Sequence, residues 1–138
     1  MLANSTNVFL LASAEPALLA ALEPILAADG ARVEIFFSAE AALPALTAAH
    51  APTLALIDVN LPGMEISRLL AAARAEATGR RFPIVLTSDT VTQEWIDRLA
   101  EGVIDDLAPR SIEPAFLRLR VEAVLRGHRQ LRELELLR

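Results

Sequence analysis

The chain has 138 residues and a formal net charge of −5, and it contains no cysteine, no tyrosine and no lysine, so all 13 basic residues are arginines. This length fits one domain with its own core, and the missing cysteines exclude disulfides, zinc–thiolate sites and thiol catalysis. The acidic balance argues against non-specific nucleic-acid binding. No apolar run is long enough to span a membrane, and the first seven residues lack the basic start of a signal peptide, so we expect a cytoplasmic protein.

Apolar runs alternate with segments of helical periodicity along the chain. The predicted strands are 8–12, 33–37, 53–57, 84–86 and 103–107. Between them we expect helices from Pro16 to before Asp29, over about 39–49, from Ile66 to near Thr78, and around 95–101. Pro44 lies inside the second helix, which should therefore be irregular or start late. A last helix is expected from about Pro114 to the end of the chain.

Five strand–helix pairs in this order predict an α/β fold with a five-stranded parallel sheet, helices on both faces and an extended C-terminal helix. This is the doubly wound, flavodoxin-like arrangement. The alternative is another small Rossmann-like module, but no Gly-x-Gly-x-x-Gly motif follows the first strand.

Asp58 directly follows the apolar run Leu54 to Ile57, and Asn60 and the turn 61–64 come next. A carboxylate in this position lies at the carboxyl edge of the sheet, where open α/β folds bind ligands. An acid that merely ends a strand is the simpler interpretation of Asp58 taken alone.

Asp58, the Leu61-Pro62-Gly63-Met64 turn and Thr87 at the end of the fourth strand together resemble a CheY-like response-regulator receiver domain over roughly residues 7–126. The resemblance implies a receiver-like domain at 1–126 and a helical extension at 127–138. It also implies that Asp58 is the phosphoacceptor, that Thr87 contacts the phosphoryl group, and that Asn60 and Asp58 are weak candidates for binding Mg²⁺.

Other parts of the family's site are absent. The acidic pair after the first strand is replaced by Ser13 and Ala14, with Glu15 one step beyond and expected to point away. The family's Lys-Pro pair appears as Pro109-Arg110, and Arg does not replace Lys conservatively. The aromatic residue of the fifth strand is replaced by Asp106 or Leu107. These departures predict a degenerate pseudo-receiver that is not an enzyme and has no cofactor, or only weakly bound Mg²⁺.

The predicted C-terminal helix carries a heptad seam formed by Leu117, Val121, Val124, His128 and Leu131. Residues 117–125 are expected to pack on the sheet, whereas the apolar residues beyond Gly127 are left for a partner helix, most simply in a parallel homodimer. We also expect an output domain beyond Arg138.

The main interpretation is therefore a two-component signalling module that acts through protein partners, either a histidine kinase or an output domain. The helices at about 95–101 and 114–138, with the fifth strand, are its expected contact face. One alternative is a working phosphoacceptor at Asp58. Another is a sensor of a phosphate-bearing small molecule such as a cyclic dinucleotide, with Arg contacts drawn from Arg80, Arg81, Arg98 and Arg110. A metabolic enzyme lacks support, since no Ser/His/Asp set or Gly-rich loop is present.

Overall fold

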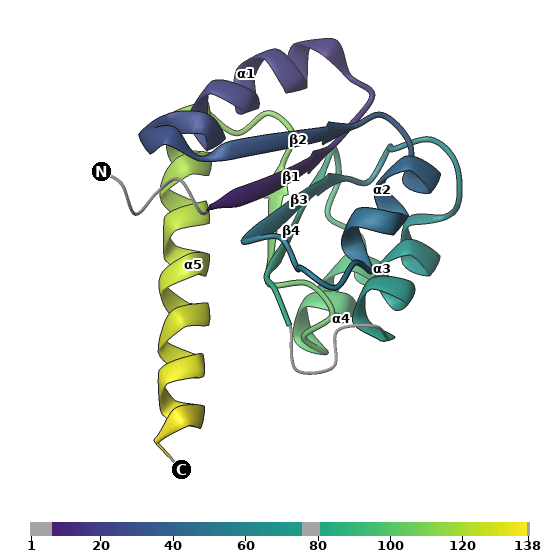
Figure 1. Cartoon of the computed structure of the whole chain (residues 1–138). Helices are drawn as coiled ribbons and strands as arrows, with labels where there is room; N and C mark the ends of the chain where they lie inside the picture. The colour runs from purple at the N-terminus through teal and green to yellow at the C-terminus, as the bar shows by residue number, and fades with distance from the viewer. Residues whose placement is uncertain (1–6, 76–80, 138) are drawn as a thin grey trace.

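The computed structural model describes residues 7–75 and 81–137 (Figure 1). Their sheet has five parallel strands in the order β2-β1-β3-β4-β5. The strands are β1 (Val8–Ala12), β2 (Arg32–Phe36), β3 (Leu54–Asp58), β4 (Ile84–Ser88) and β5 (Asp106–Pro109). This order confirms the predicted flavodoxin-like fold.

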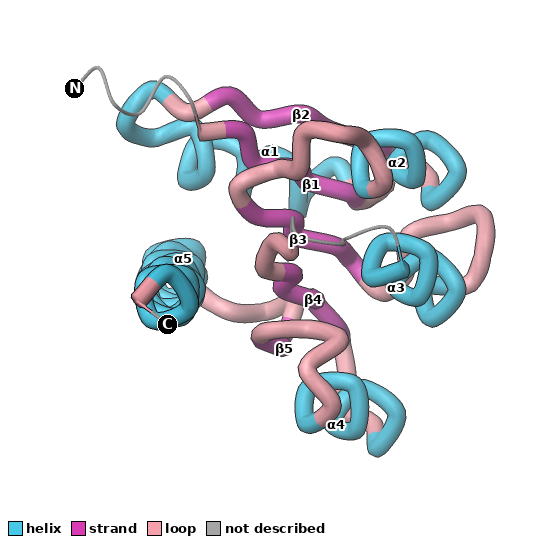
Figure 2. Tube along the Cα trace, turned by 60° about the horizontal axis from the view of Figure 1, so that its bottom comes forward, coloured by secondary structure: helices cyan, strands magenta, loops and turns pink. Residues whose placement is uncertain are grey.

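Helices cover both faces of the sheet (Figure 2). On one face lie α1 (Pro16–Ala27), which continues into the short 3₁₀ turn η2 (Ala28–Gly30), and α5 (Pro114–Leu136). On the other face lie α2 (Ala39–Leu46), α3 (Ile66–Ala75) and α4 (Gln93–Ala100). All residues of the central strands β3 and β4 are buried, as expected for parallel strands covered on both sides.

Two predicted elements have different bounds in the structure. The fifth strand lies at Asp106–Pro109 rather than at 103–107, because the Val103 N–H donates to the Arg98 carbonyl and closes the end of α4. The apolar residue Ile104 belongs to the loop and is buried in the core all the same. The apolar character of Val103 and Ile104 therefore reflects burial, and it does not indicate a strand.

Helix α2 begins at Ala39, so the expectation of a late start is wrong. The Ser38 hydroxyl accepts from the Ala41 N–H and caps the helix at its first turn. The helix stops at Leu46, short of the predicted end near residue 49, and the Thr47 N–H and hydroxyl both donate to the Leu43 carbonyl there. The predicted end of the third helix, near Thr78, lies outside the described residues.

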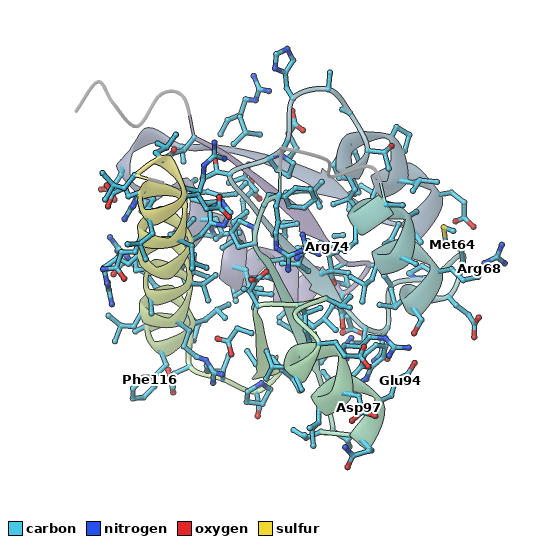
Figure 3. The ribbon with its side chains drawn as sticks, turned by 90° about the horizontal axis from the view of Figure 1, so that it is seen from below. Met64, Arg68, Arg74, Glu94, Asp97 and Phe116 are labelled. Atoms are coloured by element: carbon cyan, nitrogen blue, oxygen red, sulfur yellow. The ribbon has the colours of Figure 1, made fainter. Side chains whose placement is uncertain are left out.

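Arg74 ties α3 to the loops that precede β4 and β5. Its guanidinium donates to the Phe82 carbonyl at 2.7 Å, the Val103 carbonyl at 2.9 Å and the Asp105 carboxylate at 3.1 Å. Burial, and then the charge of Arg81, lower the pKa of Arg74 to about 10, while Asp105 opposes this shift. Seen from below, Arg74 lies toward the interior, whereas Glu94 and Asp97 of α4 lie at the periphery (Figure 3).

Helix α5 runs without a break for 23 residues, or about 35 Å at 1.5 Å per residue. Figure 1 shows that its C-terminal half extends past the edge of the sheet. Leu117 and Val121 are buried against the body, as predicted, while Leu131 and Leu134 are 63% and 61% exposed. No helix of the described residues is both long and apolar enough to cross a membrane.

Candidate functional site

Three buried polar side chains meet at the carboxyl edge of the sheet. Ser13 follows β1, Asp58 ends β3, and Thr87 lies opposite Asp58 in the register of β4. Their exposed fractions are 0%, 1% and 1%. The sheet register brings them together, because the ends of neighbouring parallel strands lie side by side.

The Asp58 carboxylate is enclosed by hydrogen-bond donors. Its Oδ1 accepts from the Arg110 Nε and from the Asn60 N–H, each at 3.2 Å. Its Oδ2 accepts from the Arg110 Nη2 at 2.5 Å and from the Ser13 hydroxyl at 3.1 Å. The Arg110 fork is therefore bidentate, which is the strongest geometry for an arginine–carboxylate pair.

Arg110 comes from the end of β5, where its N–H donates to the Ser88 carbonyl and fixes the backbone. Its Nη1 lies 3.5 Å from the Asp89 carboxylate and 3.8 Å from that of Glu15. Burial lowers the pKa of Arg110, but the hydrogen bonds and charge of Asp58, with the charges of Asp89 and Glu15, outweigh this effect and raise the pKa overall. The guanidinium is therefore a permanent cation held among three carboxylates.

Asn60 adds to this arrangement from the turn after β3. With its side-chain oxygen turned toward the guanidinium, the amide accepts from Arg110 Nη1 at 3.2 Å and Nη2 at 3.0 Å. The turn itself packs on α2, whose Ala39 N–H donates to the Pro62 carbonyl. Both the backbone N–H and the side chain of Asn60 thus serve the Asp58–Arg110 pair.

Unlike the other polar side chains of the site, Thr87 makes no hydrogen bond through its hydroxyl to any described residue. The hydroxyl is buried all the same. A hollow of about 300 Å³ between α1 and α5 is lined by Thr87, Arg110 and apolar side chains of both helices. The candidate phosphoryl contact therefore lies at the site without bonding to Asp58.

The donor set does not fit Mg²⁺. That ion needs several hard oxygen ligands in octahedral geometry. The Ser13 hydroxyl donates to Asp58, and Ala14 has no polar side chain. The guanidinium of Arg110 lies against the Asp58 carboxylate, where a cation would otherwise bind. No group of three potential metal-binding side chains occurs among the described residues.

Two features of the site departed from the sequence interpretation. Glu15 was expected to point away, but its carboxylate lies 3.8 Å from Arg110 at the rim of the site. Arg110 is the central partner of Asp58, and the only feature of the sequence that indicated this role was its position next to Pro109.

The arginines predicted to contact a phosphate ligand do not converge. Arg110 binds Asp58, Arg98 pairs with Glu101 and Arg81 donates to the Gly102 carbonyl; Arg80 lies outside the described residues.

No family model and no curated protein matches this sequence. Solved structures do match its fold. A CheY-like response regulator receiver domain protein from Methanospirillum hungatei JF-1 is 22% identical, with a TM-score of 0.78 over 90% of this chain and 97% of that one. A structure of adenylate cyclase from Rhodopirellula baltica is 19% identical, with a TM-score of 0.78 over 95% of this chain and 96% of that one.

NtrX from Brucella abortus, solved in complex with ADP, is 23% identical with a TM-score of 0.80, and the match covers 95% of this chain and 30% of that one. The doubly wound α/β fold is thus that of response-regulator receiver domains, as the sequence resemblance predicted. Sequence identities this low define the fold alone, and the role of the chain has to be argued from its own residues.

Proposed function

We propose that this chain is a receiver-fold module of two-component signalling in which the phosphorylation site is degenerate. In this proposal it is a cytoplasmic, non-enzymatic protein that works through contacts with a histidine kinase or an output domain. Residues 1–126 form the receiver-like domain, and 127–138 extend it toward a partner. The observation that carries the proposal is the bidentate pairing of Arg110 with Asp58.

Phosphoryl transfer needs a carboxylate oxygen that is free to attack, and positive charge that stabilises the transferring oxygens. Here each oxygen of Asp58 already accepts two hydrogen bonds, and the cation is bound to the nucleophile itself. Freeing Asp58 would leave a buried carboxylate without its counterion, which is strongly unfavourable. Asp58 therefore acts as the structural anion that holds Arg110 and links the end of β5, across β4, to the end of β3.

The alternative is a working phosphoacceptor. The retained Thr87, with its unpartnered hydroxyl beside Arg110, is the specific observation in its favour. This alternative requires Arg110 to swing away and allow a phosphoryl group to bridge Asp58 and Thr87.

Intact-mass measurement after incubation with acetyl phosphate and Mg²⁺ tests the proposal. We expect no stable gain of a phosphoryl group on the wild-type chain, because Arg110 occupies the carboxylate. A phosphorylatable receiver domain treated in parallel shows that the reagent is active. A gain on the wild type that the Asp58→Asn variant lacks would overturn the proposal and establish the alternative.

A further inference from the structure

A second polar cavity lies at the opposite edge of the sheet, where the strands begin. It has a volume of about 470 Å³ and is bounded by the segment before β3, the segment before β4 and the outer part of α5. Its lining includes three arginines, Arg81, Arg129 and Arg132, and the histidines His50 and His128. This is within the size range of pockets that bind small molecules.

The charge of this cavity is one-sided. None of its described lining residues is acidic, and the rest of the lining is either neutral and polar, such as Asn7 and Thr53, or apolar, such as Pro52, Phe82 and Leu125. Arg129 and Arg132 form no ion pair within the part of the chain that the structure describes. Two guanidinium groups are therefore available to a ligand in a chain that is acidic overall.

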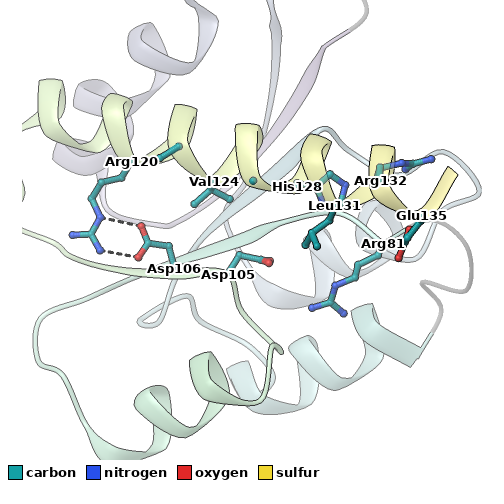
Figure 4. A pocket seen from close by; sticks show the side chains of 11 residues that line it. Arg81, Asp105, Asp106, Arg120, Val124, His128, Leu131, Arg132 and Glu135 are labelled. Atoms are coloured by element: carbon teal, nitrogen blue, oxygen red, sulfur yellow. Dashed lines mark hydrogen bonds and ion pairs between the residues drawn. The ribbon is translucent and has the colours of Figure 1, made fainter. Parts of the chain in front are cut away.

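Helical spacing explains how α5 contributes to the cavity. Leu125, His128, Arg129 and Arg132 are separated by three, one and three residues and therefore share one face of the helix. This face lines the cavity together with the segments that precede β3 and β4. Figure 4 shows the adjoining groove along α5, where Arg81, His128 and Arg132 again lie together.

Two acidic side chains of the adjoining groove are engaged elsewhere, and the third, Glu135, lines that groove and not the cavity. Asp106 pairs with Arg120 through two hydrogen bonds, drawn in Figure 4, and Asp105 accepts from Arg74 and from the Ile84 N–H. Burial lowers the pKa of His128; the charge of Asp105 opposes this shift, and the smaller effects of Arg132, Arg81 and Arg74 add to it. Three guanidinium groups therefore lie close enough to His128 to act on its charge.

We propose that this cavity binds a phosphate ester of nucleotide size. Arg129 and Arg132 would hold the phosphate oxygens, since guanidinium groups bind phosphate in bidentate fashion. The apolar surface of Pro52 and Leu125 would contact the base or another flat apolar group. The site is separate from Asp58 and does not depend on whether that residue is phosphorylated.

Isothermal titration calorimetry with AMP and GMP, each compared with its nucleoside and with pyrophosphate, tests this proposal. We expect at least one nucleotide to bind the wild-type chain with a Kd below about 1 mM, and to bind more tightly than its nucleoside and than pyrophosphate. The Arg129→Ala/Arg132→Ala variant should bind that nucleotide at least tenfold more weakly. Circular dichroism would show that this variant remains folded, as expected for substitutions at exposed positions.

The matched control is Arg118→Ala/Arg126→Ala, which removes the same charge from the same helix outside the cavity. We expect its affinity to stay within about twofold of the wild type, because neither Arg118 nor Arg126 lines the cavity and so neither can contact the bound phosphate. Equal weakening in the two double variants would show non-specific attraction and overturn the proposal. Failure of every nucleotide to bind at about 1 mM, or pyrophosphate binding as tightly as the nucleotides, would also overturn it.

Discussion

At the scale of single residues, the decisive feature is one ion pair that joins positions 52 apart in the sequence. Asp58 is 1% exposed and the Arg110 side chain is 17% exposed, so the pair is largely removed from water. Such a pair adds little net stability compared with apolar residues, yet loss of one partner leaves the other charge buried and unpaired. The pair therefore fixes the geometry of the site more than it stabilises the whole fold.

Replacing Arg110 with alanine should show how costly the loss of one partner is. We expect Arg110→Ala to lower the free energy of unfolding by about 3 kcal/mol, because the Asp58 carboxylate would lose its counterion and two hydrogen bonds. Urea denaturation followed by circular dichroism measures the change. Adding Asp58→Asn to this variant should recover part of the loss, since the neutral amide needs no counterion.

Arg118→Ala is the matched control for this measurement. Arg118 forms exposed ion pairs with Glu122 and Asp29, and such pairs contribute no more than about 1 kcal/mol. A change in Arg110→Ala no larger than that of the control would contradict the assigned role of Arg110. So would a double variant that is less stable than Arg110→Ala alone.

The sequence allowed part of this site to be predicted. Asp58, Ser13 and Thr87 directly follow or end strands, and the order of parallel strands brings such residues to one edge. The positions of Glu15 and Arg110 could not be predicted in the same way. Their long side chains reach across the edge by several rotatable bonds, and neither strand periodicity nor spacing specifies where they end.

At the scale of elements, Gly127 is the unusual residue of α5. It lies in the interior of a 23-residue helix, and a Cβ added there would meet no atom within 4 Å. Glycine is about 1 kcal/mol less favourable than alanine in a helix interior. We therefore expect Gly127→Ala to raise the free energy of unfolding by up to about 1 kcal/mol, measured by urea denaturation.

Gly102→Ala is a control for Gly127→Ala, because the expected change in stability has the opposite sign. Gly102 has a φ of +79°, a conformation that alanine adopts only with strain, and we expect this substitution to destabilise the chain. If Gly127→Ala also lowered stability, the continuous helix across residue 127 would be wrong. The boundary between the receiver-like domain and its extension would then coincide with a break in α5.

Element bounds also show what the sequence can predict. The apolar run Val8–Ala12 was correctly predicted as an inner strand, because a parallel strand that is covered on both faces needs apolar residues throughout; all but the half-buried Val8 are buried. The shift of the fifth strand from 103–107 to Asp106–Pro109 could not be predicted from hydropathy. An apolar loop residue such as Ile104 fills the core as effectively as a strand residue does.

At the scale of the whole molecule, α5 is the part that the body does not cover. Leu131 and Leu134 lie beyond Gly127 and are more than 60% exposed, and Leu136 and Leu137 are more than 80% exposed. An apolar stripe on a projecting helix is stabilised by burial against another helix. A parallel homodimer through this segment satisfies that requirement with a second copy of the same chain.

We therefore expect a dimer, of twice 14.9 kDa, in size-exclusion chromatography with light scattering at micromolar concentration. The Leu131→Asn/Leu134→Asn variant should be monomeric, because it places polar groups in the shared apolar stripe. The control is Phe37→Asn, which removes a side chain that is 63% exposed and lies outside α5, just after β2. A wild-type monomer at every concentration would reject the dimer, and a double variant that stayed dimeric would move the interface away from the end of α5. Because the hydrogen bonds of Asp58 go to Ser13, Asn60 and Arg110 and none reaches the end of α5, the Asp58→Asn variant should have the same mass as the wild type.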